Sequence, residues 1–227
     1  MAVFRSIVFA AVLSGLLVGS FATIAQHIAT VPLIVQAEVY EQQAHNEQHE
    51  DEGWQPANGF ERNTYTALFN LVDWIGFALL LNGALVLMRR PVTWREGYLW
   101  GLGAFVAFVI APGLGLPPEL PGVPTAPLLP RQLWWTATVM ATACGLGLIA
   151  FSRSAVVAAA AILLIAAPHF VGAPRLEHVD TNVPKFLSHR FVVAVTLTAL
   201  PCWALLGALT GHFYRRFSRD AAGMLPG

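Results

Sequence analysis

Residues 65–88 read YTALFNLVDWIGFALLLNGALVLM, with a single charged side chain, Asp73, and with Arg89 and Arg90 directly after them. An α-helix of about 20 predominantly apolar residues crosses the hydrocarbon core of a bilayer. The stretch is long enough and apolar enough to do so. It therefore predicts a transmembrane helix with arginines at one of its ends.

Five more apolar stretches occur in this chain of 227 residues, which is 56% hydrophobic and 11% charged. They are residues 6–29, 96–110, 133–151, 154–167 and 191–213. The stretch 154–167 is short for a span, but without a tight turn around Arg153 it would merge with 133–151 into a run too long for one crossing. We therefore predict an all-α, polytopic membrane helical bundle of about six transmembrane helices, with residues 1–227 as a single membrane domain.

The first stretch has a second interpretation. Arg5 and the apolar residues after it also fit a cleaved signal peptide, with a marginal cleavage site at residues 23–25, although the apolar run is longer than usual for one. Cleavage would leave five spans in the same orientation.

The basic residues predict the orientation. The arginines near 89–95 and 215–219 lie at span ends, and placing both termini inside puts eight of the 13 basic residues inside and five outside. This bias is typical of cytoplasmic loops. We expect a multi-pass protein of the bacterial cytoplasmic membrane with its N- and C-termini inside. Residues 30–62, 112–132 and 168–190 are then the outer segments.

This topology places carboxylates and imidazoles together on the outer face. It puts ten of the 13 acidic residues in the outer segments, with Asp73 further along its span as an eleventh on the outer side. It also puts six of the seven histidines in the outer segments or at the adjacent span edges. Divalent transition metals bind these two kinds of ligand. The distribution therefore predicts a surface that handles metal ions.

The segment 38–52, EVYEQQAHNEQHEDE, is the densest in candidate ligands. If the chain stays helical beyond the membrane, Glu38, Glu41, His45 and His49 fall on one face at spacings of three, four and four. His45 and His49 form an i,i+4 pair, which presents two imidazoles to one ion. The alternative is a solvated polar connector.

Two further groups are candidates. In the third outer segment, His169, His178 and Asp180 could supply metal ligands, although a single histidine there could equally be a hydrogen-bonded structural residue. Asp73 lies deep in its span, where acidic residues usually face the interior of a bundle as part of a path. Asn70, three residues earlier, is expected to share that face. The alternative for Asp73 is a protonated or neighbour-held structural residue.

The sequence lacks the motifs that are typical of several enzyme and ligand-binding functions. The sequence has no Gly-x-x-x-x-Gly-Lys, Gly-x-Ser-x-Gly or His-Glu-x-x-His pattern, so we do not expect an enzyme. Its single lysine, Lys185, offers no basic patch for nucleic acid. Cys144 and Cys202 lie in apolar stretches as small core residues, and the histidines cluster at span edges and not at mid-helix positions suited to haem. We expect no tightly bound cofactor.

Motifs along nearly the whole chain resemble one family. They are residues 32–34 and 38–41, WQP at 54–56, GFER at 59–62, APGLGLPPELPG at 111–122, RQLWW at 131–135, residues 168–169 and 172–174, and FYRR at 213–216. With them the chain resembles the bacterial membrane proteins described as probable cobalt transporter subunit CbtA. The resemblance implies a role in cobalt uptake, often beside a small one-span, histidine-bearing partner subunit. It carries no ligand assignments.

The sequence thus predicts a membrane subunit, embedded in the lipid bilayer, that captures Co²⁺ or another divalent transition metal on its outer face and passes it inward. The identity of the ion comes from the resemblance alone, since mixed histidine and carboxylate ligands accept several such metals. The alternative is a non-transporting membrane scaffold or a metal-binding accessory subunit.

Overall fold

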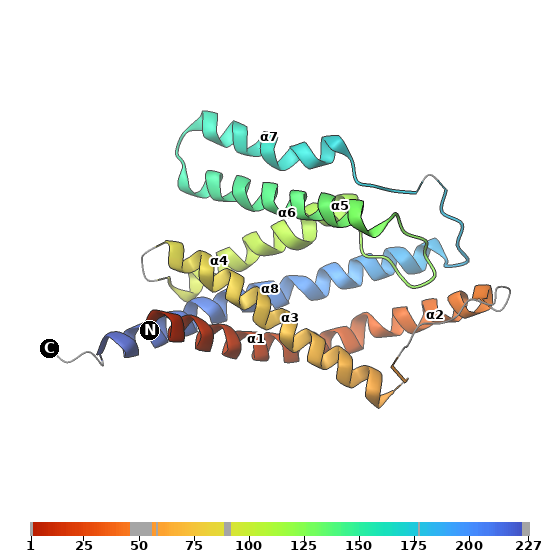
Figure 1. The fold of residues 1–227 in the computed structure, drawn as a ribbon, viewed down its shortest axis with the longest axis horizontal. Helices are drawn as coiled ribbons and strands as arrows, with labels where there is room; N and C mark the ends of the chain where they lie inside the picture. The colour runs from red at the N-terminus through yellow and green to blue at the C-terminus, as the bar shows by residue number, and fades with distance from the viewer. Residues whose placement is uncertain (1, 46–55, 58, 89–91, 177, 224–227) are drawn as a thin grey trace. The chain divides into compact units, whose positions relative to one another are not determined.

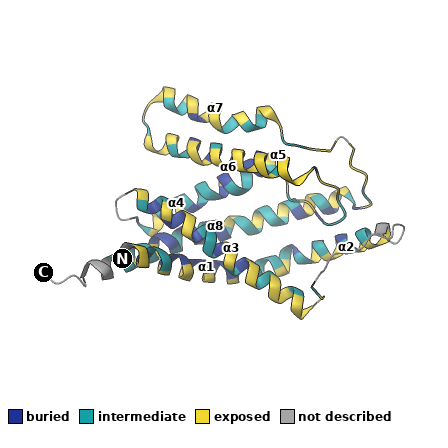
Figure 2. Ribbon diagram, in the orientation of Figure 1, coloured by how far each residue is buried: buried dark blue, intermediate teal, exposed yellow. Residues whose placement is uncertain are grey.

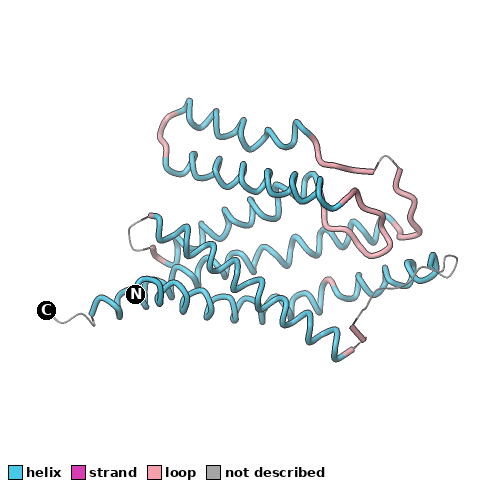
Figure 3. Tube along the Cα trace, in the orientation of Figure 1, coloured by secondary structure: helices cyan, strands magenta, loops and turns pink. Residues whose placement is uncertain are grey.

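The computed structural model describes residues 2–45, 56–57, 59–88, 92–176 and 178–223. These residues are helical with no strand, which confirms the predicted all-α class (Figures 1 and 3). The elements in chain order are α1 (Ala2–Ala29), α2 (Val31–His45), α3 (Phe60–Leu87), α4 (Trp94–Phe105), η1 (Val106–Ile110), α5 (Ala111–Gly115), α6 (Leu128–Phe151), α7 (Ala155–Val171) and α8 (Lys185–Gly223).

Within the described part of the chain, five stretches of helix are long and apolar enough to cross a membrane, judged by length and composition. They are Phe4–Ala29, Phe60–Leu87, Trp94–Gly115, Leu128–Phe151 and Lys185–Ser218. The predicted span at residues 154–167 corresponds to α7, a separate apolar helix of 17 residues. A short turn separates α6 from α7 as predicted, and Ser154 caps α7 by accepting a hydrogen bond from the Val157 N–H at 3.5 Å. The polytopic helical membrane bundle is confirmed.

The chain divides into two compact units. Unit 1 contains residues 1–28, 51–102 and 198–227, and unit 2 contains residues 29–50 and 103–197. Unit 1 therefore includes α1, α3, most of α4 and the second part of α8. Unit 2 includes α2, η1, α5, α6, α7 and the first part of α8. Each unit is described by itself below.

In unit 1, glycines let α1 lie directly against α3. A Cβ atom added to Gly15 would lie 2.5 Å from the Ile75 Cα, and one added to Gly19 would lie 3.0 Å from the Asn70 carbonyl oxygen. Gly19 follows Gly15 in α1, whereas its partner Asn70 precedes Ile75 in α3, so the two helices are antiparallel. Small residues of this kind allow membrane helices to approach backbone to backbone.

The α4–α8 contact in unit 1 is closer still. Gly97 and Gly101 on α4 face Gly207 and Gly211 on α8, and a Cβ atom added to Gly101 would lie 3.0 Å from the Gly207 Cα. Trp203 on α8 also packs its ring on Trp74 and Phe77 of α3, with ring centroids 5.5 Å and 4.8 Å apart. Thr93 begins α4 in a capping box, because its N–H donates to the Glu96 carboxylate at 2.8 Å while its hydroxyl oxygen accepts from the Glu96 N–H at 3.2 Å.

Unit 2 contains a helical irregularity beside a proline. Val106–Ile110 form a π-helical segment, and the Ala111 N–H donates to the Val106 carbonyl. Pro112 follows directly and has no N–H for the Phe108 carbonyl, which favours the wider turn. Further along, Ile165 of α7 packs against Gly145 on α6, where a side chain would not fit. A Cβ atom added to Gly145 would lie 2.5 Å from the Ile165 Cγ1. The remaining faces of α6 and α7 carry exposed apolar side chains, which suits contact with lipid (Figure 2).

Candidate functional site

The three predicted outer segments meet in unit 2. Leu33 and Ala37 on one face of α2 belong to a buried apolar cluster with Leu120, Val183 and Leu187. Leu120 comes from the connection between α5 and α6, Val183 from the connection before α8, and Leu187 from the first turn of α8. Burial of this apolar face holds α2 against both loops.

Gly122 is the point at which all three segments touch. Its backbone has φ +76°, and a Cβ atom there would lie 3.1 Å from the Glu41 Cβ and 3.4 Å from Val183. The Thr181 hydroxyl donates to the Gly122 carbonyl at 2.7 Å. Glycine is required both by the left-handed backbone and by the lack of space. The position of Glu41 is thereby fixed against a loop that is distant in sequence.

The predicted ligand helix exists as far as the structure describes it. Glu38 and Glu41 are half-buried on α2, and His45 is the last residue of that helix. The side chain of His45 and the whole of His49 lie outside the described residues. The shared helical face is therefore established for the backbone positions of Glu38, Glu41 and His45, and the metal site itself stays a prediction.

The candidates in the third outer segment lie in different environments. His169 is half-buried, and its ring meets the Trp134 ring edge to face at a centroid distance of 5.7 Å. The Trp134 indole N–H donates to the Pro168 carbonyl at 2.9 Å, which fixes this pair of aromatic rings at the end of α7. His178 and Asp180 are exposed. Within the described part of the chain, no three histidine, cysteine or acidic side chains lie close enough to hold a metal ion together.

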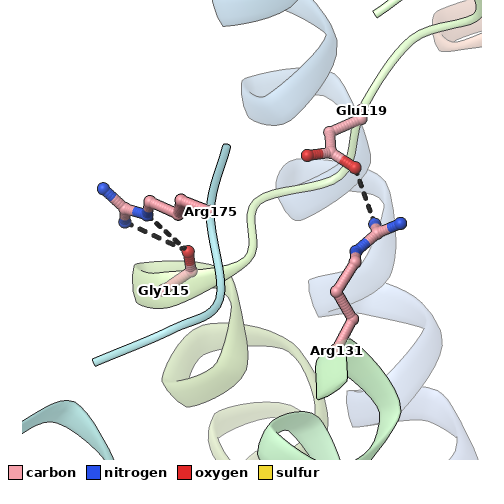
Figure 4. Close-up of polar contacts among 4 residues, drawn as sticks. All are labelled: Gly115, Glu119, Arg131 and Arg175. Atoms are coloured by element: carbon pink, nitrogen blue, oxygen red, sulfur yellow. Dashed lines mark hydrogen bonds and ion pairs between the residues drawn. The ribbon is translucent and has the colours of Figure 1, made fainter. Parts of the chain in front are cut away.

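Two arginines secure the connection between α5 and α6 (Figure 4). Arg131 forms an ion pair with Glu119 at 2.6 Å, and Arg175 donates from Nε and Nη2 to the Gly115 carbonyl at 3.3 Å and 3.0 Å. Both Glu119 and Arg131 lie in the predicted outer segment 112–132, but their pairing was not predicted. Glu119 therefore has a structural partner within its own outer segment.

The two residues of the predicted path differ in burial. Asn70 is only 6% exposed, and its side-chain amide donates to the Thr23 hydroxyl at 3.1 Å and to the Gln26 side-chain oxygen, Oε1, at 2.9 Å. Asp73, in contrast, is exposed on α3 beside Phe69 and Val72, which are 72% and 71% exposed. The expected common interior face is thus not found within unit 1. The packing face of α3 passes through Asn70 and Trp74, and Asp73 lies on the neighbouring face.

Comparison with known proteins gives a family for this fold. No curated protein and no solved structure matches the chain. Residues 4–215 match the family described as probable cobalt transporter subunit (CbtA). The match covers all the candidate spans except the last residues of the span in α8. The resemblance inferred from the loop motifs is confirmed, and this multi-pass helical membrane protein belongs to the CbtA family of probable cobalt transporter subunits.

Proposed function

We propose that this protein is the membrane subunit of a cobalt uptake transporter that captures Co²⁺ on its outer face and passes it inward. The observation that carries the proposal is α2, a helix packed on two loops that bears Glu38, Glu41 and His45 at successive turns. A helix held in this way presents its ligands with little further loss of conformational freedom. Family membership supports transport over catalysis.

The capture shell proposed here combines the carboxylates of α2 with the imidazoles of His45 and His49. Carboxylate and imidazole suit Co²⁺ and its neighbours in the transition series. We propose His169, His178 and Asp180 as secondary ligands from the third outer segment. The word subunit in the family description implies a partner, and we propose a small one-span protein that supplies further ligands from the same side.

A second function is a metal-binding accessory or scaffold that captures ions without moving them. It uses the same ligands on α2 and differs from the first function only in that no ion crosses the membrane. Metal flux into vesicles that contain the purified protein, with and without a partner subunit, separates the two functions. Accumulation of Co²⁺ above that in protein-free vesicles supports transport, and binding without accumulation supports the accessory role.

The orientation is tested by cysteine labelling in intact cells. In a background with Cys144 and Cys202 replaced by alanine, a cysteine at Gln43 on α2 should react with a membrane-impermeant maleimide, and a cysteine at Ser218 should react only after lysis. The expectation follows from the arginines at the span ends. The reverse pattern of labelling would place α2 inside and remove the basis for capture from the outer face.

The ligand pair on α2 is tested by a double substitution. His45→Ala with His49→Ala should weaken Co²⁺ binding at least about 10-fold in isothermal titration, because two imidazoles leave the shell. Binding by the parent protein should also weaken below about pH 6.5, where imidazoles in peptides become protonated and no longer bind metal.

The matched control for the double variant is His189→Ala, which removes another exposed histidine from the predicted outer side. This variant should bind Co²⁺ as the parent protein does. Equal affinity in the double variant and the parent would return the segment 38–52 to the interpretation of a solvated connector.

A further inference from the structure

Among the described residues of unit 1, three buried side-chain oxygen atoms have no hydrogen-bond partner. They are the Ser14 Oγ on α1, the Asn82 Oδ1 on α3 and the Thr210 Oγ1 on α8. All three residues are 0% exposed. A buried polar group without a partner is costly, and such groups in native proteins usually bind ordered water. Ser14, Asn82 and Thr210 lie on three helices of one unit, and each is a place at which an ordered water molecule would be stabilised.

Other hydroxyl side chains on these helices form hydrogen bonds with the backbone of their own helix. The hydroxyls of Ser20, Thr66 and Thr196 each donate to the carbonyl four residues earlier, at 2.8, 2.9 and 2.8 Å. This is the usual solution for a lone hydroxyl in an apolar helix. Ser14 and Thr210 do not adopt it. Asn82 donates its amide to the Ala78 carbonyl at 2.9 Å and leaves its side-chain oxygen without a donor.

The contacts of the neighbouring residues place these oxygens inside unit 1. Ser14 adjoins Gly15, which packs on Ile75 of α3. Asn82 lies about 10 Å beyond Ile75 along α3, at about 1.5 Å per residue. Thr210 lies between Trp203, which packs on α3, and Phe217, which packs on Phe9 of α1 with ring centroids 6.3 Å apart.

A further polar cluster lies nearer the start of α3. Asn70, with its hydrogen bonds to Thr23 and Gln26, lies about 18 Å from Asn82 along α3 at about 1.5 Å per residue. Ser14, near Ile75, falls between these two levels. The interior of unit 1 thus carries polar side chains at intervals along an otherwise apolar span.

We propose that Ser14, Asn82 and Thr210 bind a chain of internal water molecules through which unit 1 conducts protons. Hydroxyl and amide oxygens are neutral, and they match the hydrogen-bonding of water better than the imidazole and carboxylate ligands that transition metals prefer. Water bridges between buried polar groups are common where two or more partners are within reach. The route is separate from the exposed Asp73 and does not depend on which metal the protein handles.

Proton flux in vesicles without divalent metal tests the proposal. A potassium gradient with valinomycin sets the membrane potential, and a trapped pH-sensitive dye reports proton entry. The parent protein should acidify the vesicles faster than protein-free vesicles do. Asn82→Leu and Thr210→Val keep the side-chain size and remove the oxygen, and each should lower the flux about 10-fold, the factor that corresponds to one lost hydrogen bond.

Two control variants isolate the oxygen as the cause. Thr138→Val removes a buried hydroxyl that already donates to the Trp134 carbonyl at 2.8 Å, and it should leave the proton flux unchanged. Thr210→Ser keeps the hydroxyl and should retain the flux that Thr210→Val loses. A flux in Thr210→Ser as low as in Thr210→Val would overturn the proposal, as would parent flux equal to that of protein-free vesicles.

Thermal unfolding gives a second, independent measurement. If the three oxygens bound no water molecule, an apolar side chain of similar shape would remove a polar group without a hydrogen bond and would raise the melting temperature. With water bound, Thr210→Val and Asn82→Leu should leave the melting temperature unchanged or lower it. Raised melting temperatures with unchanged proton flux would overturn the proposal.

Discussion

Gly101→Leu should leave little folded protein in the membrane. Gly101 lies against the α8 backbone, where an added Cβ would meet the Trp203 carbonyl oxygen and would lie 3.0 Å from the Gly207 Cα. Neither atom belongs to a side chain that could rotate away. Overpacking a well-packed contact costs about 1–3 kcal/mol, and a contact between two backbones belongs at or above the upper end of that range. Proteins are stable by only about 5–15 kcal/mol.

The measurement is the yield of monodisperse protein in mild detergent together with its melting temperature. Gly103→Leu is the matched control, because Gly103 lies two residues further along α4 and has no neighbouring atom within 4 Å of an added Cβ. The two variants make the same change in helix propensity and hydrophobicity. Equal yields and melting temperatures for both would show that α4 and α8 do not pack through these glycines.

The α4–α8 contact also shows what the sequence could have disclosed. Gly97 and Gly101 are separated by three residues, as are Gly207 and Gly211, and this spacing is typical of close helix packing in membranes. Apolar length, from which the spans were predicted, does not reveal this pattern. Even when recognised it would have left the pairing open, since several glycines of the chain could have faced one another. Which helices approach is a property of the folded chain.

The elements themselves were predicted well because they depend on local composition. Apolar length identified the six helices, and the tight turn between α6 and α7 was predicted from Arg153 and two serines. The shared face of Glu38 and Glu41 was predicted on the condition that the chain stays helical there, and α2 meets that condition. Long-range contacts were not predictable in this way. Nothing in the residues near Gly122 indicates that Glu41 and Thr181 lie beside it.

The burial of Asn70 and Asp73 could not be predicted from the sequence of α3 alone. In a soluble protein the apolar stripe tells which side of a helix is buried. In a membrane helix nearly every side is apolar, so the sequence of α3 does not reveal which face packs on its neighbours. Asn70 turned out to be buried and Asp73 exposed. We therefore propose that any path past Asp73 runs along the surface of unit 1, where another element or a partner covers it.

Asp73→Asn should abolish Co²⁺ uptake while leaving the protein folded and able to bind metal on its outer face. Asp73 is central in α3, about 20 Å from either end of the helix at about 1.5 Å per residue. A carboxylate at the centre of a membrane costs about 2.5–3.5 kcal/mol on insertion scales, so such a residue is expected to meet a cation or a polar surface. The basic residues of the spans lie toward their ends and not at this depth. We propose that the transported cation or a proton is the counter-charge of Asp73.

The expected fall in uptake is at least about 100-fold, since one lost charge interaction of about 2.7 kcal/mol or more corresponds to that factor. Uptake is measured as Co²⁺ accumulated per folded protein, and outer-face binding by titration of the same sample. Asp73→Glu keeps the carboxylate and should retain most of the uptake, while Val72→Ala alters the adjacent exposed position and should have little effect. Uptake at the parent rate by a well-folded Asp73→Asn protein would show that Asp73 is structural, and the inward path would then have to follow other polar groups, beginning with those buried inside unit 1.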